Sequence, residues 1–368
     1  MRVFQTHILG PHYYGYFNSK NNYSDEKHSD RKIRVLDDRH CSTHVLSPMY
    51  DNRKDVYLAL GDDDIAQKLW AKEKGLKAKS LQDILLAQIE EFKPDVFYTN
   101  DPIIIGSSIV KRFPSCVKKS IAWRASLMGD LEANDLSDYN LVVSNFKTIN
   151  EEARKKFGLR TAWFSPSWDP EMRFYARNKD RPCDIYFGGS YRKTRGIYDE
   201  RIESLNKLSK LSRSHHVEVR LMYRKISRLR SRGIFRWIPI PNLLQKNLRR
   251  LNKPPVYGRE MFERHSKAKI IVNPATDLAG NIRGNMRCWE ALGCGSLMIA
   301  TEGDYPDGFI SGENFVAYKD VSDMEHKIKE LLLDDDKRTS IAENGYNMIS
   351  KLWTKERQWN DFKSLVEL

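Results

Sequence analysis

Residues 269–301 read KIIVNPATDLAGNIRGNMRCWEALGCGSLMIAT, and this stretch alone predicts a strand-loop-helix-strand unit. The apolar run 269–274 predicts a strand, a polar loop with glycine follows, and a helix over 284–293 leads into a second strand over 296–301. Loops at the carboxyl ends of strands and the N-termini of helices present unpaired N–H groups. The stretch therefore predicts a binding site for an anion such as phosphate.

The helix of this stretch has one charged face and one apolar face. Arg283, Arg287 and Glu290 follow one another at spacings of four and three residues, which places them on one side. Guanidinium groups pair bidentately with a diphosphate, and a carboxylate accepts hydrogen bonds from ribose hydroxyls. The pattern predicts a sugar-nucleotide site, and an ordinary solvent-exposed helix face with salt bridges is the alternative interpretation.

The alternation of strands and helices extends in both directions. Before the central stretch we expect elements over 2–8, 55–60, 80–92, 95–100, 103–113, 119–124, 140–146, 150–158, 161–166, 184–189, 198–211, 217–223 and 258–268. The chain from Val321 onward is expected to be mostly helical. Such alternation implies parallel sheets joined by crossover helices, hence an α/β fold with two Rossmann-like domains facing a central cleft.

Two polar stretches interrupt this alternation. Residues 18–32 predict a surface excursion, and the proline-containing stretch 165–182 predicts the linker between the domains. The first domain is expected over 1–170 and the second over 183–350. The triplet Asp62–Asp64 follows an apolar strand and precedes a helix, so we expect it to cap that helix rather than to bind a metal.

Composition limits the classes of function. Five cysteines without a CxxC pair indicate neither a disulfide framework nor a thiolate zinc site, and they favour the reducing cytoplasm. No stretch approaches the roughly 20 apolar residues of a membrane helix. The net charge of +13 favours anionic partners.

Much of this charge lies in residues 224–253, which contain ten Lys or Arg and no acidic residue. Interleaved apolar residues, Trp237 among them, make the segment amphipathic. We expect it to dock on an anionic membrane surface, and a solvated loop is the alternative. Nucleic acid is not expected as a partner, because no nucleic-acid-binding module is recognisable.

RCWEALGCGSLMIAT over 287–301 and the stretch 307–349 resemble the nucleotide-sugar domain of group 1 glycosyltransferases, in particular a spore-maturation-protein-like branch. The matching positions are Arg287, Glu290, Ala291, Gly293, Phe309, Gly312, Glu313 and Tyr318. Residues 184–208 resemble the first strand and helix of the same domain, with Gly189 and Arg201 at matching places. The resemblance implies a GT-B fold, a nucleotide-sugar donor and a last helix over 351–368 that crosses back to the first domain.

Two positions depart from the resemblance. Retaining relatives carry a second glutamate eight positions before the one matched by Glu290, where this chain has Ile282. Many relatives carry a histidine where this chain has Arg124. The stereochemical course, the donor base, the sugar and the acceptor therefore stay open.

A transferase of this type must stabilise the negative charge that develops on the departing diphosphate, and arginines can do this without a metal. We predict Arg192 and Arg287 as the diphosphate clamp, and the solvated basic turn around Arg192 is the alternative. The predicted donor contacts are Gly189, Arg192, Arg283, Arg287 and Glu290.

On the acceptor side we predict Asp101, in YTNDP, and His12 as catalytic residues, because both follow strands. Turn capping is the alternative role for each. We expect no metal and no cofactor, since the nucleotide sugar is a substrate.

Together these features predict a cytoplasmic glycosyltransferase that acts on a growing glycan, lipid-linked or at the cell surface, at the inner face of the membrane. A nucleotide-sugar epimerase on the same fold and a non-catalytic protein that binds a nucleotide sugar or an anionic surface are the alternatives.

Overall fold

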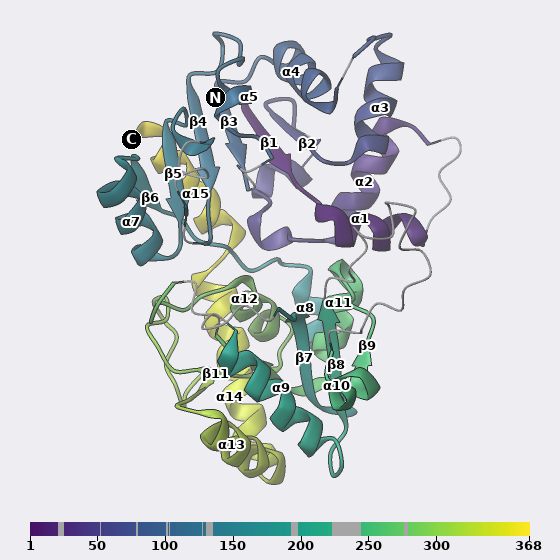
Figure 1. Ribbon diagram of the computed structural model, residues 1–368, viewed down its shortest axis with the longest axis vertical. Coiled ribbons are helices and arrows are strands. Elements are labelled where there is room, and N and C mark those ends of the chain that lie inside the picture. The colour runs from purple at the N-terminus through teal and green to yellow at the C-terminus, as the bar shows by residue number, and fades with distance from the viewer. Residues whose placement is uncertain are drawn as a thin grey trace, which may run out of the picture. The chain divides into compact units, whose positions relative to one another are not determined.

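The computed structural model describes residues 1–20, 26–51, 53–78, 80–100, 102, 104–126, 128–129, 135–192, 198–222, 244–275 and 279–368 (Figure 1). These form two compact units. Unit 1 comprises Met1–Pro170, Tyr257–Arg259 and Ser350–Leu368, and unit 2 comprises Glu171–Val256 and Glu260–Ile349. The last helix of the chain thus belongs to unit 1.

Unit 1 is built on a six-stranded sheet in the order β2-β1-β3-β4-β5-β6, and every pairing is parallel. Its strands are β1 (Val3–His7), β2 (Val56–Leu60), β3 (Val96–Thr99), β4 (Lys119–Trp123), β5 (Leu141–Ser144) and β6 (Thr161–Trp163). Its helices are α1 (Gly10–Ser19), α2 (His28–Asp38), α3 (Asp64–Glu73), α4 (Leu81–Phe92), α5 (Ser107–Val110), α7 (Lys147–Phe157) and α15 (Lys355–Glu367), with the 3₁₀ turns η1 (Ser42–His44) and η2 (Ser47–Tyr50).

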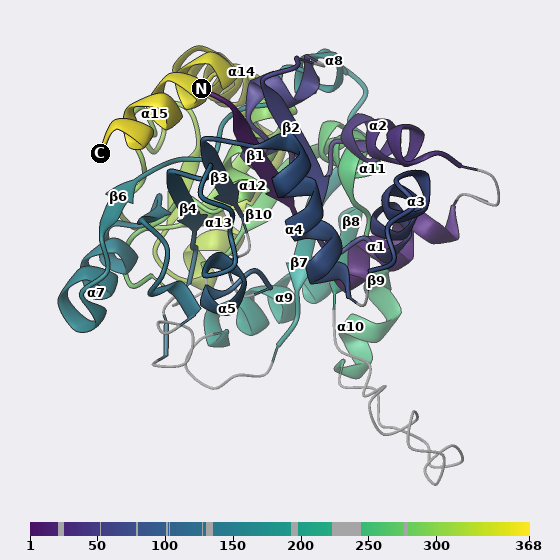
Figure 2. The same ribbon diagram turned by 90° about the horizontal axis from the view of Figure 1, so that it is seen from above.

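Both faces of this sheet are covered, so its strands read as nearly continuous apolar runs. In β3, Phe97 packs into one core layer with residues of α4, whereas Val96 and Tyr98 pack into the opposite layer. That second layer contains Tyr13 of α1 and Phe362 of α15. In both views α7 lies at the β6 edge, and α2 and α3 lie at the β2 edge (Figures 1 and 2).

Unit 2 also has a six-stranded parallel sheet, in the order β12-β11-β10-β7-β8-β9. Its strands are β7 (Cys183–Ser190), β8 (Val217–Met222), β9 (Asn252–Lys253), β10 (Ala268–Asn273), β11 (Leu297–Thr301) and β12 (Val316–Tyr318). Its helices are α8 (Met172–Ala176), α9 (Asp199–Leu211), α10 (Lys246–Leu251), α11 (Gly258–Ser266), α12 (Met286–Gly293), α13 (Val321–Leu333) and α14 (Asp335–Leu352). The boundary between the units falls inside α11 and again inside α14.

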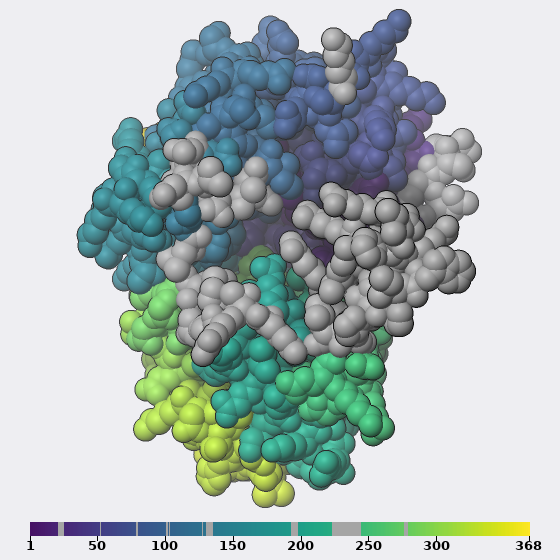
Figure 3. All heavy atoms as spheres, viewed as in Figure 1, coloured from purple at the N-terminus to yellow at the C-terminus, as the bar shows by residue number. Residues whose placement is uncertain are grey.

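One face of the second sheet packs on α9, α10, α13 and α14 through an aliphatic core. On the helices this core is formed by residues such as Leu205, Leu208, Met324 and Ile328, which recur at helical spacing. Leu333, the last residue of α13, is 90% exposed. The C-terminal part of unit 2, in yellow-green, reaches the surface in Figure 3.

The two sheets confirm the predicted α/β fold, and two local expectations were wrong. The polar stretch 18–32 contains the start of α2 at His28, because the buried Arg31 and Val35 give this helix an inner face. The expected helix over 103–113 is only the four-residue α5, which begins after Gly106. Within the expected linker 165–182, the chain passes from unit 1 to unit 2 after Pro170 and forms the short helix α8.

Of the triplet Asp62–Asp64, one residue has the predicted capping role on α3. Asp63 is the N-cap of α3, and its carboxylate accepts from the N–H groups of Ile65 and Ala66. No helix in the described part of the chain is long and apolar enough to cross a membrane.

Candidate functional site

The candidate site lies in unit 2 at the carboxyl edge of the sheet. With β7 counted as the first strand of this unit, the strand order is that of the doubly wound dinucleotide-binding fold, which reverses direction between β7 and β10. Helices leave opposite faces at such a reversal, and a crevice opens there beyond the strand ends. The residues at the end of β7, at the end of β10 and at the start of α12 therefore surround the position at which this fold binds ligands.

Two arginines converge beside the end of β7. The guanidinium carbons of Arg201 and Arg287 lie 5.9 and 6.0 Å from the centroid of the same ring, that of Phe187. Arg201 comes from α9, and Arg287 comes from the first turn of α12. Sequence separates them by 86 positions, and the reversal of the sheet brings them together.

Neither arginine is neutralised by an ion pair within the described residues. Arg201 donates from Nη1 to Ser190 Oγ at 3.3 Å and from Nη2 to the Pro274 carbonyl at 3.1 Å. The Nε atoms of Arg201 and Arg287 are buried and have no hydrogen-bond partner in the described structure. Burial, followed by the nearby charge of Arg287, lowers the pKa of Arg201 to about 10. Two close cations with unused donors form a site that an anion would stabilise.

Gly189 allows this approach. A Cβ at Gly189 would lie 3.3 Å from Arg287 Nη1 and 3.3 Å from Phe187 Cζ. A larger side chain would displace the guanidinium from the end of β7. The predicted donor residue Gly189 thus lies directly beside Arg287.

Glu290 lies one turn after Arg287 on α12 and is 7% exposed. Burial raises the pKa of Glu290, and the positive charge of Arg287 opposes that shift. The structure therefore brings together Gly189, Arg287 and Glu290, three of the predicted donor residues.

Arg283 has a different environment. Its Nε donates to the Glu302 carbonyl at 3.1 Å and its Nη1 donates to the Gly280 carbonyl at 2.5 Å. Its own N–H donates to the Asp304 carbonyl at 2.8 Å. These bonds connect the loop before α12 to the segment after β11, so Arg283 positions this loop. Direct contact between Arg283 and a donor stays a prediction.

The basic turn after β7 is only partly described. Arg192 is exposed two residues beyond the end of β7. Residues 193–197, which include Lys193 and Arg195, lie outside the described residues, as does most of the basic segment, 223–243. The role of Arg192 in a diphosphate clamp stays a prediction.

The residues predicted for the acceptor side belong to unit 1. The sheet of this unit reverses direction between β1 and β3, and His12 lies exposed in the first turn of α1, just after β1. Asp101, which follows β3, lies outside the described residues. The neighbouring Asn100 accepts from the Ile8 N–H at 3.4 Å, which ties the two strand ends together.

Two carboxylates at the strand ends were not among the predicted site residues. Asp62 accepts from the N–H groups of Leu9 and Gly10, both at 2.7 Å, and so holds the start of α1. Glu200 accepts from Thr301 Oγ1 at 2.5 Å and from the Tyr318 hydroxyl at 2.9 Å, across the ends of β11 and β12.

From the sequence, Arg201 was identified only through the resemblance to a known family. Its position relative to the leucines of α9 would also have marked it as a site residue. It precedes Leu205 by four positions and Leu208 by seven, so it shares the apolar face of α9. A charged residue on a buried face needs a partner, and this requirement marks Arg201 as a candidate site residue.

Part of the chain matches a known protein family. Residues 215–364 match a family model described as glycosyl transferase-like. Among curated protein sequences, none matches this chain.

Solved structures match over the whole chain. HepE from Anabaena, in complex with UDP and glucose, is 11% identical over 100% of this chain and 99% of its own, with a TM-score of 0.60. A glycosyltransferase from Rickettsia africae is 10% identical over 99% of this chain and 97% of its own, with a TM-score of 0.54.

A third structure matches in part. TarM from S. aureus, in a complex that contains UDP, is 13% identical over 78% of this chain and 59% of its own, with a TM-score of 0.53. The chain therefore has the GT-B fold of these structures, and its residues 215–364 match the model of a glycosyl transferase-like family.

Proposed function

We propose that this protein is a glycosyltransferase that takes a sugar from a nucleoside diphosphate donor, with a uridine nucleotide as the first candidate. The observation that carries the proposal is the pair Arg201 and Arg287, whose buried Nε atoms lack partners within the described residues at the carboxyl edge of a dinucleotide-binding sheet. Support for uridine comes from HepE and TarM, whose structures contain UDP.

In the proposed mechanism the two arginines hold the diphosphate. As the bond between the sugar and the diphosphate breaks, negative charge grows on the departing oxygen, and guanidinium groups fixed in advance stabilise it. Arg192 approaches the same group from the turn after β7. Glu290 accepts hydrogen bonds from the ribose hydroxyls, and no metal is needed.

The acceptor is a growing glycan, lipid-linked or at the cell surface, and its hydroxyl is deprotonated by a residue of unit 1. Asp101 and His12 are the candidates for this base. The basic segment 224–253 docks the enzyme on an anionic membrane surface on the cytoplasmic side. These assignments, and membership of the spore-maturation-protein-like branch, rest on the sequence.

The proposal predicts that UDP raises the melting temperature of the wild-type chain and that Glu290→Gln weakens this effect. A ligand that binds only the folded state at one hundred times its Kd adds about 2.7 kcal/mol of stability. Differential scanning fluorimetry with UDP, GDP, ADP and the corresponding UDP-sugars measures the shift. Glu203→Gln, an exposed glutamate on α9, is the matched control.

A base-selective shift that persists in Glu203→Gln and falls in Glu290→Gln is the expected result. Equal shifts in both variants would remove Glu290 from the donor site, and no shift with any nucleotide would refute the donor pocket. Turnover of the stabilising UDP-sugar then separates the alternatives. Conversion of the donor without an acceptor indicates an epimerase, and binding without turnover indicates a non-catalytic protein.

A further inference from the structure

A cavity of about 530 Å³ opens in unit 2 at the amino edge of the sheet. It is lined by α8 and the segment that follows, by α14, and by Lys269 and Gly295 at the starts of β10 and β11. The candidate donor residues lie at the opposite ends of these strands. Because β7 has eight residues, about 25 Å of strand separates the two edges.

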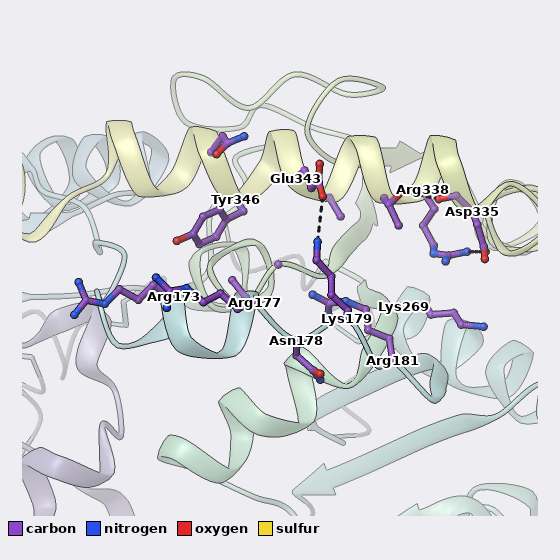
Figure 4. Close-up of a pocket in the computed structure, with 15 residues that line it drawn as sticks. Arg173, Arg177, Asn178, Lys179, Arg181, Lys269, Asp335, Arg338, Glu343 and Tyr346 are labelled. Atoms are coloured by element: carbon purple, nitrogen blue, oxygen red, sulfur yellow. Dashed lines mark hydrogen bonds and ion pairs between the residues drawn. The ribbon is translucent and has the colours of Figure 1, made fainter.

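The charge of the lining is unbalanced. The cavity is lined by six cationic side chains and two carboxylates; the six are Arg173, Arg177, Lys179, Arg181, Lys269 and Arg338. Three of these cations have a carboxylate partner, Lys179 with Glu343, Lys269 with Asp184 and Arg338 with Asp335, which leaves Arg173, Arg177 and Arg181 without an ion pair in the described part of the chain. Figure 4 shows Arg338 and Glu343 extending from α14, with Arg173 and Arg177 on the α8 side of the cavity. A cavity that is lined mainly by positive charges raises the local concentration of anions.

The inner part of the cavity is rigid. Arg181 Nη1 donates to the Ser266 carbonyl at 2.8 Å, to Ser296 Oγ at 2.9 Å and to the Ala268 carbonyl at 3.1 Å. Burial, together with a smaller effect of the Arg338 charge, lowers the pKa of Arg181 to about 10. No carboxylate pairs with Arg181 within the described residues, so its charge is held only by neutral acceptors.

Gly295 completes this inner wall. Its backbone has a φ of +73°, and a Cβ there would lie 3.0 Å from Arg181 Nη2 and 3.1 Å from the Ala176 carbonyl. The glycine thus lets the end of α8 approach the start of β11, which closes the cavity on that side.

The outer part carries cations that are not committed to other groups. Arg173 lies on α8 and Arg177 is its C-cap residue; their guanidinium carbons lie 4.7 and 6.0 Å from the centroid of the Phe174 ring, and neither has an ion pair within the described residues. Lys179 lies 3.5 Å from Glu343 in a solvent-exposed pair, which contributes little and exchanges easily. Arg173 and Arg177 thus lie beside the same ring, and no ion pair of either is found in the described structure.

We propose that this cavity is a second ligand site, which binds the phosphate groups of a small soluble molecule such as a sugar phosphate. The volume is that of a small-molecule site. Guanidinium groups bind phosphate oxygens bidentately, and Arg173, Arg177 and Arg181 line the same cavity. The site is separate from the donor edge and does not depend on the proposed transfer reaction.

The test uses inorganic pyrophosphate as the probe, in isothermal titration calorimetry of the full chain at low salt. Arg287→Gln is the starting background, because it removes the principal cation of the donor edge. We expect this background to bind pyrophosphate, and we expect the added pair Arg173→Gln and Arg177→Gln to weaken binding at least tenfold. The pair Lys210→Gln and Arg213→Gln, which removes two exposed charges elsewhere in unit 2, should leave the affinity unchanged.

Equal affinity with and without Arg173 and Arg177 would overturn the proposal, as would the absence of pyrophosphate binding to the Arg287→Gln background. If the double substitution lowers the melting temperature, Arg177→Gln alone replaces it. Glucose 1-phosphate should displace pyrophosphate from the background, whereas vesicles containing phosphatidic acid should not. Displacement by the vesicles alone would overturn the assignment to a soluble ligand.

Discussion

Arg201 and Arg287 illustrate at the scale of single residues how a binding site differs from a structural contact. Arg201 is buried and Arg287 is half-buried beside Phe187, and within the described residues Arg201 hydrogen-bonds to Ser190 and to Pro274, which holds two strand ends together. Arg287 adds positive charge next to Arg201 and lowers its pKa. We therefore expect Arg287 to contribute to ligand binding more than to folding.

This difference predicts that Arg287→Gln lowers the stability of the free protein less than Arg201→Gln does, because relief of the repulsion from Arg201 offsets loss of the attraction to Glu290. The same substitution should weaken UDP binding by roughly 10- to 100-fold, since a charge-assisted hydrogen bond contributes about 1.5–3 kcal/mol. Calorimetry and denaturant unfolding measure the two effects. Arg201→Gln should lower stability more, and a stability loss in Arg287→Gln equal to that in Arg201→Gln would contradict this assignment.

Lys355 is a buried cation at the start of α15. Its Nζ donates to the Val45 carbonyl at 2.6 Å, to Gln358 Oε1 at 3.2 Å and to the Ser42 carbonyl. Burial lowers the pKa of Lys355 to about 7, and the neighbouring Asp169 carboxylate only partly opposes this shift.

The lowered pKa predicts that Lys355 makes stability depend on pH. The unfolded chain keeps this proton up to about pH 10.4, whereas the folded chain releases it near pH 7. The unfolded state then binds more protons across this window, so stability rises as pH increases from 7 to 10. Denaturant unfolding at several pH values should show this slope in the wild type and in Lys363→Met, an exposed control on the same helix, but a smaller slope in Lys355→Met. Parallel curves for all three proteins would contradict the prediction.

At the scale of elements, close packing of α14 depends on one glycine. A Cβ at Gly345 would lie 2.5 Å from the Asn314 carbonyl oxygen and 2.8 Å from Leu292 Cδ2. The helix therefore lies directly on the loop before β12 and on the end of α12. Helix propensity alone would favour alanine here, so packing and propensity act in opposite directions.

We expect packing to dominate, because the clash involves a backbone atom that cannot move alone. Gly345→Ala should destabilise the protein by about 1–3 kcal/mol. Gly15→Ala on the exposed face of α1, where no atom lies within 4 Å of the added Cβ, should instead stabilise it by about 0.5–1 kcal/mol. Thermal unfolding of the two variants tests the opposite signs, and a stabilised Gly345→Ala would show that the loop yields.

At the scale of the whole molecule, unit 1 is assembled from both ends of the chain. Phe362 of α15 is fully buried in the same core layer as Val3 of β1, and its ring lies 5.2 Å from that of Tyr98. Gln358 of the same helix donates to the Thr43 and Ser165 carbonyls at 2.8 and 3.1 Å. Unit 1 therefore cannot complete its core without the last helix.

Phe362→Ala should accordingly cost about 3–5 kcal/mol, the usual range for deletion of a buried aromatic ring. The control Leu333→Ala removes an equally apolar side chain that is 90% exposed and should change stability by less than about 0.5 kcal/mol. Urea unfolding followed by tryptophan fluorescence measures both. Similar losses in the two variants would mean that α15 does not contribute to the core as described.

The sequence by itself determined the α/β class and most of the elements. Strands of parallel sheets are buried on both faces, so runs such as Val96–Thr99 and Leu297–Thr301 are apolar along their whole length and can be read locally. The helix with Arg287 and Glu290 could be read in the same way, because its spacing is a local property. Arg31 in α2 was missed because its burial depends on a partner, Asp63, at 2.6 Å in another element.

Only the tertiary structure decided which of these residues meet. Strand order is fixed by pairing between distant segments, and it places the end of β7 beside the end of β10, which brings Arg201 to Arg287. Strand order also places the candidate donor residues and the basic cavity beside α8 and α14 at opposite edges of the sheet, although both places are rich in arginine. The spacing of apolar residues along a helix or strand shows which side of that element is buried. Which other element covers that side depends on packing between segments that are distant in the sequence.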